Sequence, residues 1–399
     1  MTLVAGLALG MQNPVRPGID VLLSDSAHLI AGKRLGLITN QTGVDAHGVS
    51  TIDRLARWPH ARLVTLFAPE HGIRGTARPG EQVRDTVDEA TGLPIYSLQA
   101  AGRARPPSAE QLAGLDVLLV DLQDVGARPY TYHRTMVLAM RTAASARMRV
   151  IVLDRPDPIG CAVQGPELAT AYHSAVGILP VPLRHGMTMG ELARLANVEL
   201  GIGADLVVAP VSGWRRCCWF DETGLPWVPP SRNLPDLESA AWYPGTVLLE
   251  GEGLTIGTNL SVGRGTNAPL RQVGAPWMDA ARVAAAMQHR YGVRLDTLTF
   301  VPRDPGDRKY DGVPVHAVRF GRFDRRRGDA IRDVIRLLGV IRELHGDSLR
   351  VDSTLMARHL GVWPTGQAEW PEEVRAFLAR RSPYLLYRGS PCVRPPRLR

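Results

Sequence analysis

The sequence Asp116-Val117-Leu118-Leu119-Val120-Asp121 decides the fold class of this chain. Its four consecutive apolar residues between two aspartates predict a short strand buried on both faces, as the strands of parallel sheets are. On both sides of this run, further short apolar runs predict strands at 35–40, 63–67, 93–98, 149–154 and 205–210. Stretches with helical periodicity lie between these runs, at 50–56, 131–146 and 188–200. Because strands and helices alternate, we expect an α/β fold built on a parallel, doubly wound sheet.

The chain changes character near residue 214, which predicts a division into several parts. Residues 1–17 are expected to be an N-terminal extension, which could be the remnant of a signal peptide, and 18–213 carry the alternating pattern. Residues 214–276 are rich in Gly, Pro and Trp and predict a connecting region with little periodicity. Residues 277–399 predict a smaller α+β domain of ordinary size. Its expected elements are helices at 278–291 and 329–345 and strands at 298–301 and 313–320.

The composition of the 399 residues excludes several classes of protein. With 45% hydrophobic and 22% charged residues, the chain is not largely disordered. No apolar run approaches the ~20 residues that cross a bilayer, so we expect no membrane span. The net charge of +8 comes almost entirely from arginine, because Lys33 and Lys309 are the only lysines. The densest basic cluster, 322–327, is typical of a solvated turn, so we expect no nucleic-acid partner. The basic surface as a whole favours an anionic substrate.

The cysteines and the N-terminus bear on the compartment. Cys161, Cys217, Cys218 and Cys392 show no metal-binding spacing, and we expect neither a zinc site nor a disulfide framework. The apolar stretch near the N-terminus lacks the basic segment of a signal peptide. This favours a cytoplasmic protein and leaves export as the alternative.

Polar residues follow several of the predicted strands directly. Ligands of open parallel sheets bind outside the carboxyl ends of the strands, so these residues are the first candidates for a site. Asp154 could equally cap a helix or form a turn. The sequence contains no G-x-G-x-x-G after a strand, no Walker loop, no H-E-x-x-H and no G-x-S-x-G, which excludes a dinucleotide oxidoreductase and a classical serine hydrolase. The candidate residues are Asn40, Glu70, His71, Asp121, Gln123, Asp154 and Arg155.

Carboxylates in a cleft suit glycoside hydrolysis, in which one acid protonates the leaving oxygen and a second group activates water or attacks the sugar. The acid needs a raised pKa, and partial burial beside Phe67 and Pro69 could raise the pKa of Glu70.

A set of short blocks follows one another along the chain, at 39–43, 66–75, 121–128, 130–132, 153–156, 184–188, 229–231, 263–266 and 384–387. Each block alone is a weak signal, but the ordered set covers the chain from about Gly18 to Tyr387. Together these blocks resemble the signature blocks of the NamZ-type exo-β-N-acetylmuramidases, a family long catalogued as a domain of unknown function.

This resemblance implies a fold and an activity. The fold would be a Rossmann-like catalytic domain at 18–213, a cleft-lining region at 214–276 and a smaller α+β C-terminal domain at 277–399. The activity would be that of an exo-acting glycosidase that removes N-acetylmuramic acid from the non-reducing end of peptidoglycan fragments. Its partner would be a muropeptide or a MurNAc-GlcNAc substrate, and no metal or organic cofactor is implied.

The resemblance also implies roles for particular residues. Glu70 would be the catalytic acid, with His71 and His185 as polarising or hydrogen-bonding groups nearby. A bidentate arginine would bind the lactyl carboxylate of muramic acid. Arg264, Arg128 and Arg155 are the candidates, and each could instead tie loops together. Tyr130 and Tyr132 could stack on the sugar or pack the start of a helix.

The sequence departs from the family pattern at several positions. Gln164 stands where a glutamate is expected, and Glu167 could replace that carboxylate. Arg232 stands where a proline is expected. The stretch 249–259 is longer than in the family, so Glu250 and Glu252 compete for the role of second carboxylate.

Two other functions follow from these observations. Gln164 motivates a non-catalytic muropeptide-binding protein on the same scaffold, and the imidazoles of His71 and His185 motivate a hydrolase of an ester or amide bond. A retaining, an inverting and a substrate-assisted mechanism all stay open, because the sequence gives no carboxylate separation. The oligomeric state stays open as well.

Overall fold

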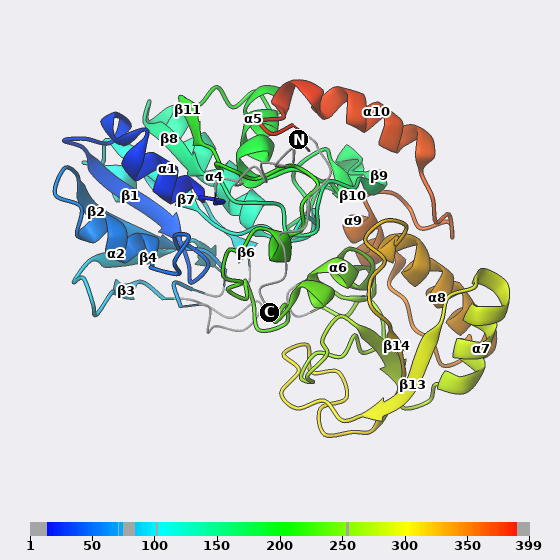
Figure 1. The fold of residues 1–399 in the computed structure, drawn as a ribbon. Helices are drawn as coiled ribbons and strands as arrows, with labels where there is room; N and C mark the ends of the chain where they lie inside the picture. Colours follow the sequence, from blue (N-terminus) through cyan, green and yellow to red (C-terminus); the bar gives the residue numbers. More distant parts are fainter. Residues whose placement is uncertain (1–13, 71, 75–83, 101–102, 253–254, 389–399) are drawn as a thin grey trace, which may run out of the picture.

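A computed structural model describes residues 14–70, 72–74, 84–100, 103–252 and 255–388 (Figure 1). The strands of the main sheet are β1 (Arg34–Thr39), β2 (Arg62–Ala68), β3 (Thr86–Val87), β4 (Pro94–Ser97), β7 (Val117–Asp121), β8 (Arg149–Leu153) and β11 (Leu206–Ala209). They form one sheet in the order β11-β8-β7-β1-β2-β4-β3, in which only the edge strand β3 is antiparallel to its neighbour. The chain runs from β1 outward to β4 on one side and to β11 on the other. This order confirms the predicted doubly wound sheet.

Helices cover both faces of this sheet, as the apolar run of β7 predicts. Val117 and Leu119 pack with α1 (Gly18–Ser24) and α2 (Thr51–Ala56) on one face. Leu118 and Val120 pack with α4 (Tyr132–Ser145) and α5 (Met189–Glu199) on the other. All five residues of β7 are buried. Shorter elements border the sheet: α3 (Ala109–Leu112), β5 (Gln99–Ala100) with β6 (Arg103–Ala104), and β9 (Gln164–Glu167) with β10 (Pro182–Arg184).

The C-terminal part contains a second, smaller sheet, in agreement with the predicted α+β region. Its strands are β12 (Gln272–Ala275), β13 (Leu295–Phe300) and β14 (Val315–Phe320), which pair antiparallel in the order β12-β14-β13. The helices of this part are α7 (Ala280–Tyr291), α8 (Ala330–His345) and α9 (Ser353–Leu360). One hydrophobic cluster runs from α4 and α5 of the first part to α7 and α8 of the second.

Residues 214–276 hold more regular structure than the sequence suggests. They include β12 and a helix, α6 (Leu237–Thr246), that the periodicity does not predict. The residues from Ser239 to the end of α6 are all buried, so α6 has no polar face and no amphipathic period. Pro244 inside the helix further hides the helical pattern. On α6, Trp242 stacks on Phe320 of β14 with ring centroids 4.2 Å apart.

The end of the chain returns to the first part. The helix α10 (Pro371–Arg381) lies beside α5 (Figure 1), and Arg381 donates to the carbonyls of His185 and Gly186 at 2.8 Å each. Beyond α10, the backbone N–H of Leu386 donates to Glu191 at 2.7 Å. The hydroxyl of Tyr387 donates to Asp154 at 2.5 Å. The last described residues therefore supply hydrogen bonds to Asp154, which follows β8, and to Glu191 of α5.

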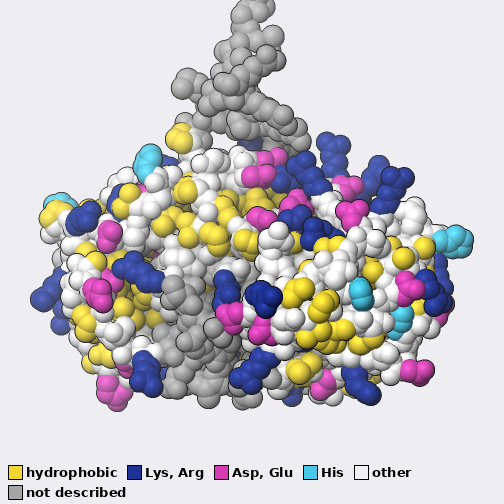
Figure 2. All heavy atoms as spheres, turned by 90° about the horizontal axis from the view of Figure 1, so that it is seen from below, with side chains coloured by type: hydrophobic (Ala, Val, Ile, Leu, Met, Phe, Trp, Pro, Cys, Tyr) yellow, Lys and Arg dark blue, Asp and Glu magenta, His cyan; other side chains and the backbone are white. Residues whose placement is uncertain are grey.

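Charged side chains are spread over the surface and often paired. On the face shown in Figure 2, basic and acidic side chains are interspersed. Within the basic cluster 322–327, Arg325 binds Asp221 at 2.7 Å and lies over the ring of Trp219 at 4.5 Å. Part of this cluster is therefore packed, rather than a purely solvated turn.

In the part of the chain that the structure describes, no helix is both long and apolar enough to cross a bilayer.

The prediction that the chain has no disulfide is wrong. Cys161 and Cys217 form a disulfide bond with Cα atoms 4.7 Å apart. They are separated by 56 residues, and they become neighbours only through the tertiary fold, so spacing rules could not identify them. Cys392 lies outside the described residues.

We expect the Cys161→Ser, Cys217→Ser double variant to lose roughly 2–4 kcal/mol of unfolding free energy, because the bond closes a long loop in the unfolded chain. Urea unfolding measures this loss. Either single variant should cost about as much as the double variant, since each alone removes the bond. An unfolding midpoint equal to that of the wild type would contradict the assignment.

Candidate active site

A pocket lies where the first part of the chain meets the C-terminal part. Its cavity volume is about 120 Å³. Glu70 and the segment 129–131 line it from the main sheet, and 231–234 border it from the connecting region. The polar residues that line the remaining walls are Tyr243, Glu250, Thr255, Arg264, Asp307, Lys309 and His359.

Glu70 lines the pocket next to the carboxyl end of β2. It follows β2 directly after Pro69 and is half-buried. The hydroxyl of Thr131, the residue that precedes α4, donates to Glu70 Oε2 at 2.6 Å. This bond holds the carboxyl group at the N-terminal end of α4. The neighbouring candidate His71 lies outside the described residues.

Glu250 and Arg264 form an ion pair on the opposite wall. Arg264 Nε and Nη2 each donate to one carboxylate oxygen of Glu250, the Nη2 contact measuring 2.8 Å. Burial raises the pKa of Glu250, but the charge and hydrogen bonds of Arg264 outweigh it, so that the pKa lies below its usual value. Glu250 is therefore an ionised group whose two oxygens are already engaged. The competing Glu252 points to Arg358 at 3.4 Å and does not line the pocket.

Three further pocket residues were not predicted. Asp307 and Lys309 come from the loop between β13 and β14, and His359 comes from α9. Burial lowers the pKa of His359 to about 4, so the imidazole is neutral near pH 7. The only sequence signal was the rarity of lysine in a chain whose positive charge is almost all arginine. The histidines are scattered along the sequence, and nothing distinguished His359.

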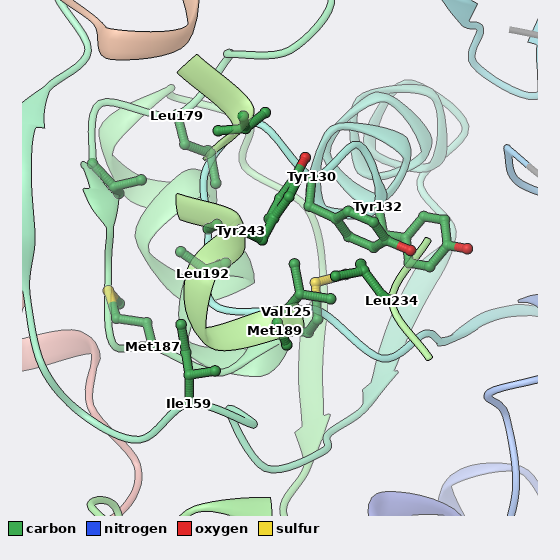
Figure 3. Close-up of a cluster of buried hydrophobic side chains, with 14 of the residues drawn as sticks. Val125, Tyr130, Tyr132, Ile159, Leu179, Met187, Met189, Leu192, Leu234 and Tyr243 are labelled. Carbon is green, nitrogen blue, oxygen red and sulfur yellow. The ribbon is translucent and has the colours of Figure 1, made fainter. Parts of the chain in front are cut away.

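Three tyrosines, Tyr130, Tyr132 and Tyr243, lie side by side in a buried hydrophobic cluster (Figure 3). The rings of Tyr130 and Tyr132 meet edge to face at 4.7 Å, and Tyr243 meets Tyr130 at 6.0 Å. Tyr130 and Tyr243 line the pocket, whereas Tyr132 is fully buried behind it. Burial raises the pKa of all three hydroxyls, which therefore stay protonated at neutral pH.

Asn40 and Gln123 hold loops rather than line the pocket. Asn40 donates to the Tyr132 hydroxyl at 2.6 Å, and that hydroxyl donates to the carbonyl of Pro230 at 2.9 Å. Asn40 thereby fixes the segment that precedes the pocket wall at 231–234. The amide of Gln123 donates to the carbonyls of Asp124 and Pro156, and its side chain is buried.

Asp121 and Arg155 form a buried ion pair between β1, β7 and β8. Arg155 donates to both oxygens of Asp121, at 2.6 and 3.0 Å, and to the carbonyl of Val44 at 2.7 Å. The hydroxyl of Thr51 at the start of α2 donates to Asp121 at 2.5 Å. Neither residue lines the pocket. Gly43 passes so close that a Cβ atom there would lie 2.1 Å from Thr39 Oγ1.

Asp154 also has internal partners. Its oxygens accept from the backbone of Gly190 at 2.8 Å and from the hydroxyls of Thr188 and Tyr387 at 2.7 and 2.5 Å. Burial raises its pKa to about 6 despite these bonds. Asp154 thus binds the start of α5, which agrees with the capping interpretation.

Arg128 and Gln164 are structural in this arrangement as well. Arg128 is fully buried and donates to the carbonyls of Pro166, Val181 and His359 at 2.7–3.1 Å. Gln164 accepts from Arg184 at 2.9 Å and donates to the carbonyl of Gly328 at 2.8 Å. Neither side chain lines the pocket.

His185 belongs to a separate buried polar cluster. Its Nδ1 accepts from the backbone of Met187 at 3.2 Å, and its Nε2 lies 3.3 Å from Asp124. Asp157 lies in the same cluster, and burial raises its pKa to about 7. One Asp157 oxygen accepts from the backbone of Ile159 at 3.1 Å, and the other has no hydrogen-bond partner among the described residues. A protonated Asp157 fits this environment.

Comparison with known proteins agrees with this architecture. Residues 35–238 match the family of the N-terminal domain of exo-β-N-acetylmuramidase NamZ, and residues 241–387 match the family of its C-terminal domain. The chain belongs to the NamZ family. It is 41% identical over 343 residues to the peptidoglycan β-N-acetylmuramidase NamZ of Bacillus subtilis strain 168, covering 85% of this chain and 80% of that protein. Membership of the NamZ family makes this chain a glycoside hydrolase of the muramidase class.

Two crystal structures of DUF1343 family proteins from Bacteroides fragilis NCTC 9343 share the fold. One superimposes with a TM-score of 0.82 at 32% identity, covering 94% of this chain and 99% of that one. The other has a TM-score of 0.72 at 30% identity, covering 95% of this chain and all of that one. The sheet and the C-terminal part thus recur together in these two relatives.

The buried ion pair gives the first prediction for this site. Arg155→Met leaves Asp121 buried without its counter-charge, and we expect a loss of about 3–5 kcal/mol in unfolding free energy. Arg149→Met is the matched control, because the Arg149–Asp205 pair is exposed and should contribute under about 1 kcal/mol. Urea unfolding compares the two. An Arg155→Met variant of normal stability that loses only substrate binding would instead restore Arg155 as a substrate ligand.

Asp157 gives a pH-dependent prediction. Its folded-state pKa of about 7 lies above the unfolded value, so the group destabilises the wild-type fold as pH rises from about 4 through 7. Asp157→Asn removes this titration. We expect the stability of the variant relative to wild type to increase between pH 5 and pH 8, measured by urea unfolding. Asp205→Asn, an exposed control, should show no such trend, and a flat Asp157→Asn difference would refute the assignment.

Proposed function

We propose that this chain releases N-acetylmuramic acid from the non-reducing end of peptidoglycan fragments, using acid/base chemistry in the pocket around Glu70. The observation that carries the proposal is the position of Glu70, a carboxyl group fixed by Thr131 at 2.6 Å in the pocket between the two parts of the chain. The NamZ of Bacillus subtilis, a relative at 41% identity, is a peptidoglycan β-N-acetylmuramidase.

The shape of the pocket supports action at a chain end. Its walls come from Glu70 after β2, from 231–234, from α6 and from the loop that carries Asp307 and Lys309. A pocket bordered on these several sides suits a terminal sugar better than a glycan strand passing through.

The state of Glu250 bears on the mechanism. Because Arg264 engages both of its oxygens, Glu250 is poorly placed to act as a nucleophile or base. We therefore propose a substrate-assisted route, which some glycosidases use. Glu70 donates its proton to the glycosidic oxygen while the N-acetyl oxygen of the sugar attacks C1. Water then opens the cyclic intermediate, and Glu70 takes up the proton of that water.

The residues that the structure describes give no specific support to the two other functions. The binding-protein hypothesis rested on Gln164, whose side chain binds Arg184 and Gly328 away from the pocket. The ester or amide hydrolase rested partly on His185, which is fully buried and does not line the pocket.

We expect Glu70→Gln to lower kcat/KM on a chromogenic β-N-acetylmuraminide by roughly 100- to 10,000-fold, the usual contribution of a general acid. The amide keeps the shape of the side chain but cannot donate the required proton. Release of the chromophore measures the effect, and thermal unfolding checks that the variant is folded.

Glu89→Gln serves as the control, because Glu89 is an exposed carboxylate outside the pocket. The matching β-N-acetylglucosaminide, which lacks the lactyl ether, tests the sugar preference. Wild-type turnover of neither sugar, with thermal stabilisation by N-acetylmuramic acid, would favour the binding-protein hypothesis. Full activity in Glu70→Gln would exclude Glu70 as the acid.

A further inference from the structure

Lys309 is a buried cation on the wall of the pocket. Its side chain is 7% exposed, and its ammonium group donates to the carbonyls of Leu249 and Leu260 at 3.3 and 2.9 Å. No carboxylate of the described residues comes within 4.0 Å of the ammonium group. A buried charge without an opposite charge in contact is costly, so a pocket that retains one is suited to an anionic ligand.

The loop that carries Lys309 is strained. Asp304, Arg308 and Tyr310 have positive φ angles of 49°, 59° and 56°, a backbone conformation that residues other than glycine rarely adopt. Contacts with the neighbouring loop hold this shape: Arg303 N–H donates to the carbonyl of Gly265 at 2.9 Å, and the Tyr310 hydroxyl to that of Asn259 at 2.7 Å. Strain of this kind persists where the surroundings enforce it, often at ligand sites.

The other cation of the pocket is already paired. Arg264 directs Nε and Nη2 to Glu250, so its bidentate edge is not available to a ligand. The carboxyl of Asp307 accepts from the backbone N–H of Lys309 at 3.1 Å, rather than from its ammonium group. The ammonium group has three donors, and two are used by carbonyls. Asp307 and Glu250 lie near enough to act on the charge of Lys309, but their described hydrogen bonds go to the Lys309 backbone and to Arg264. One donor of the ammonium group therefore remains for a bound anion.

We propose that Lys309 binds the carboxylate of the substrate's lactyl ether and thereby sets the preference for muramic acid over sugars without an acidic substituent. This inference rests on the proposed function, because it takes the lactyl ether as the anionic group that enters the pocket. It assigns to Lys309 the role that the sequence suggested for Arg264, Arg128 or Arg155. Arg264 then serves to keep Glu250 in place.

The test compares two substrates that differ only in charge: a chromogenic β-N-acetylmuraminide with a free lactyl carboxylate and its lactyl methyl ester. We expect wild type to prefer the free acid. Lys309→Met should lower kcat/KM for the acid by roughly 10- to 100-fold, as for a lost hydrogen bond to a charged group, and leave the ester within about twofold. Lys33→Met, which removes the other lysine from an exposed position, should change neither.

Each remaining outcome decides the proposal. An equal fall for acid and ester, or no fall for either, would overturn it. Arg264→Gln should lower both substrates alike, because it disturbs Glu250, and a selective loss of the acid there would move the role to Arg264. If Lys309→Met does not fold, Lys309→Gln keeps two donors for the carbonyls and should still lose the preference for the acid. Failure of both variants to fold would mean that Lys309 is only structural.

A failure of the proposed function is distinguishable from a failure of this inference. If wild type turns over neither substrate, calorimetric titration with N-acetylmuramic acid and with its methyl ester replaces the kinetic comparison. Tighter binding of the acid to wild type, lost in the Lys309 variant, would support Lys309 as the anion site of a protein that is not a muramidase. Equal binding of acid and ester would overturn the inference independently of catalysis.

Discussion

The buried ion pair between Asp121 and Arg155 ties together the carboxyl ends of the central strands of the main sheet. It lies at the carboxyl ends of β1 and β7, between the two strands where the direction of winding reverses. In doubly wound sheets this crevice is the usual ligand site. Here the crevice is filled by the chain itself, since Asp121 also binds Thr51 and Arg155 also binds Val44. The pocket that we propose as the active site lies instead beside β2 and the start of α4, where the C-terminal part supplies the remaining walls.

Both parts of the chain contribute walls to this pocket. The hydrophobic cluster that covers one face of the main sheet continues through α6 into α7 and α8 without interruption. Glu70 comes from one side of the pocket, whereas Glu250, Arg264 and Lys309 come from the other. Their relative position therefore depends on shared core packing rather than on a flexible hinge. A packed core of this kind has low compressibility, and it holds the groups on either side of the pocket at fixed separations.

The sequence predicted the main sheet well because buried parallel strands are short apolar runs, and those runs are local. It failed on α6, which is buried all round, and on the Cys161–Cys217 bond, which joins distant segments. For the site, Glu70 was identified as a polar residue after a predicted strand and Glu250 through the family resemblance, and both line the pocket. The strand-end residues Asn40, Asp121, Gln123 and Asp154 were expected there too, but polar residues at strand ends also satisfy one another. Sequence cannot separate these two uses, because the difference lies in which way a side chain turns.

The return of the chain to the main sheet has a consequence for its synthesis. Asp154 and Glu191 belong to the first part of the protein, yet Leu386 and Tyr387, which bind them, are among the last described residues to leave the ribosome. The nascent first part must therefore wait for the C-terminal segment before these buried carboxyl groups gain those partners. A polypeptide truncated before residue 380 would lose this closure although every strand of the main sheet is present. Because the C-terminal segment is synthesised last, Asp154 and Glu191 gain these hydrogen bonds only after residues 386 and 387 have been made.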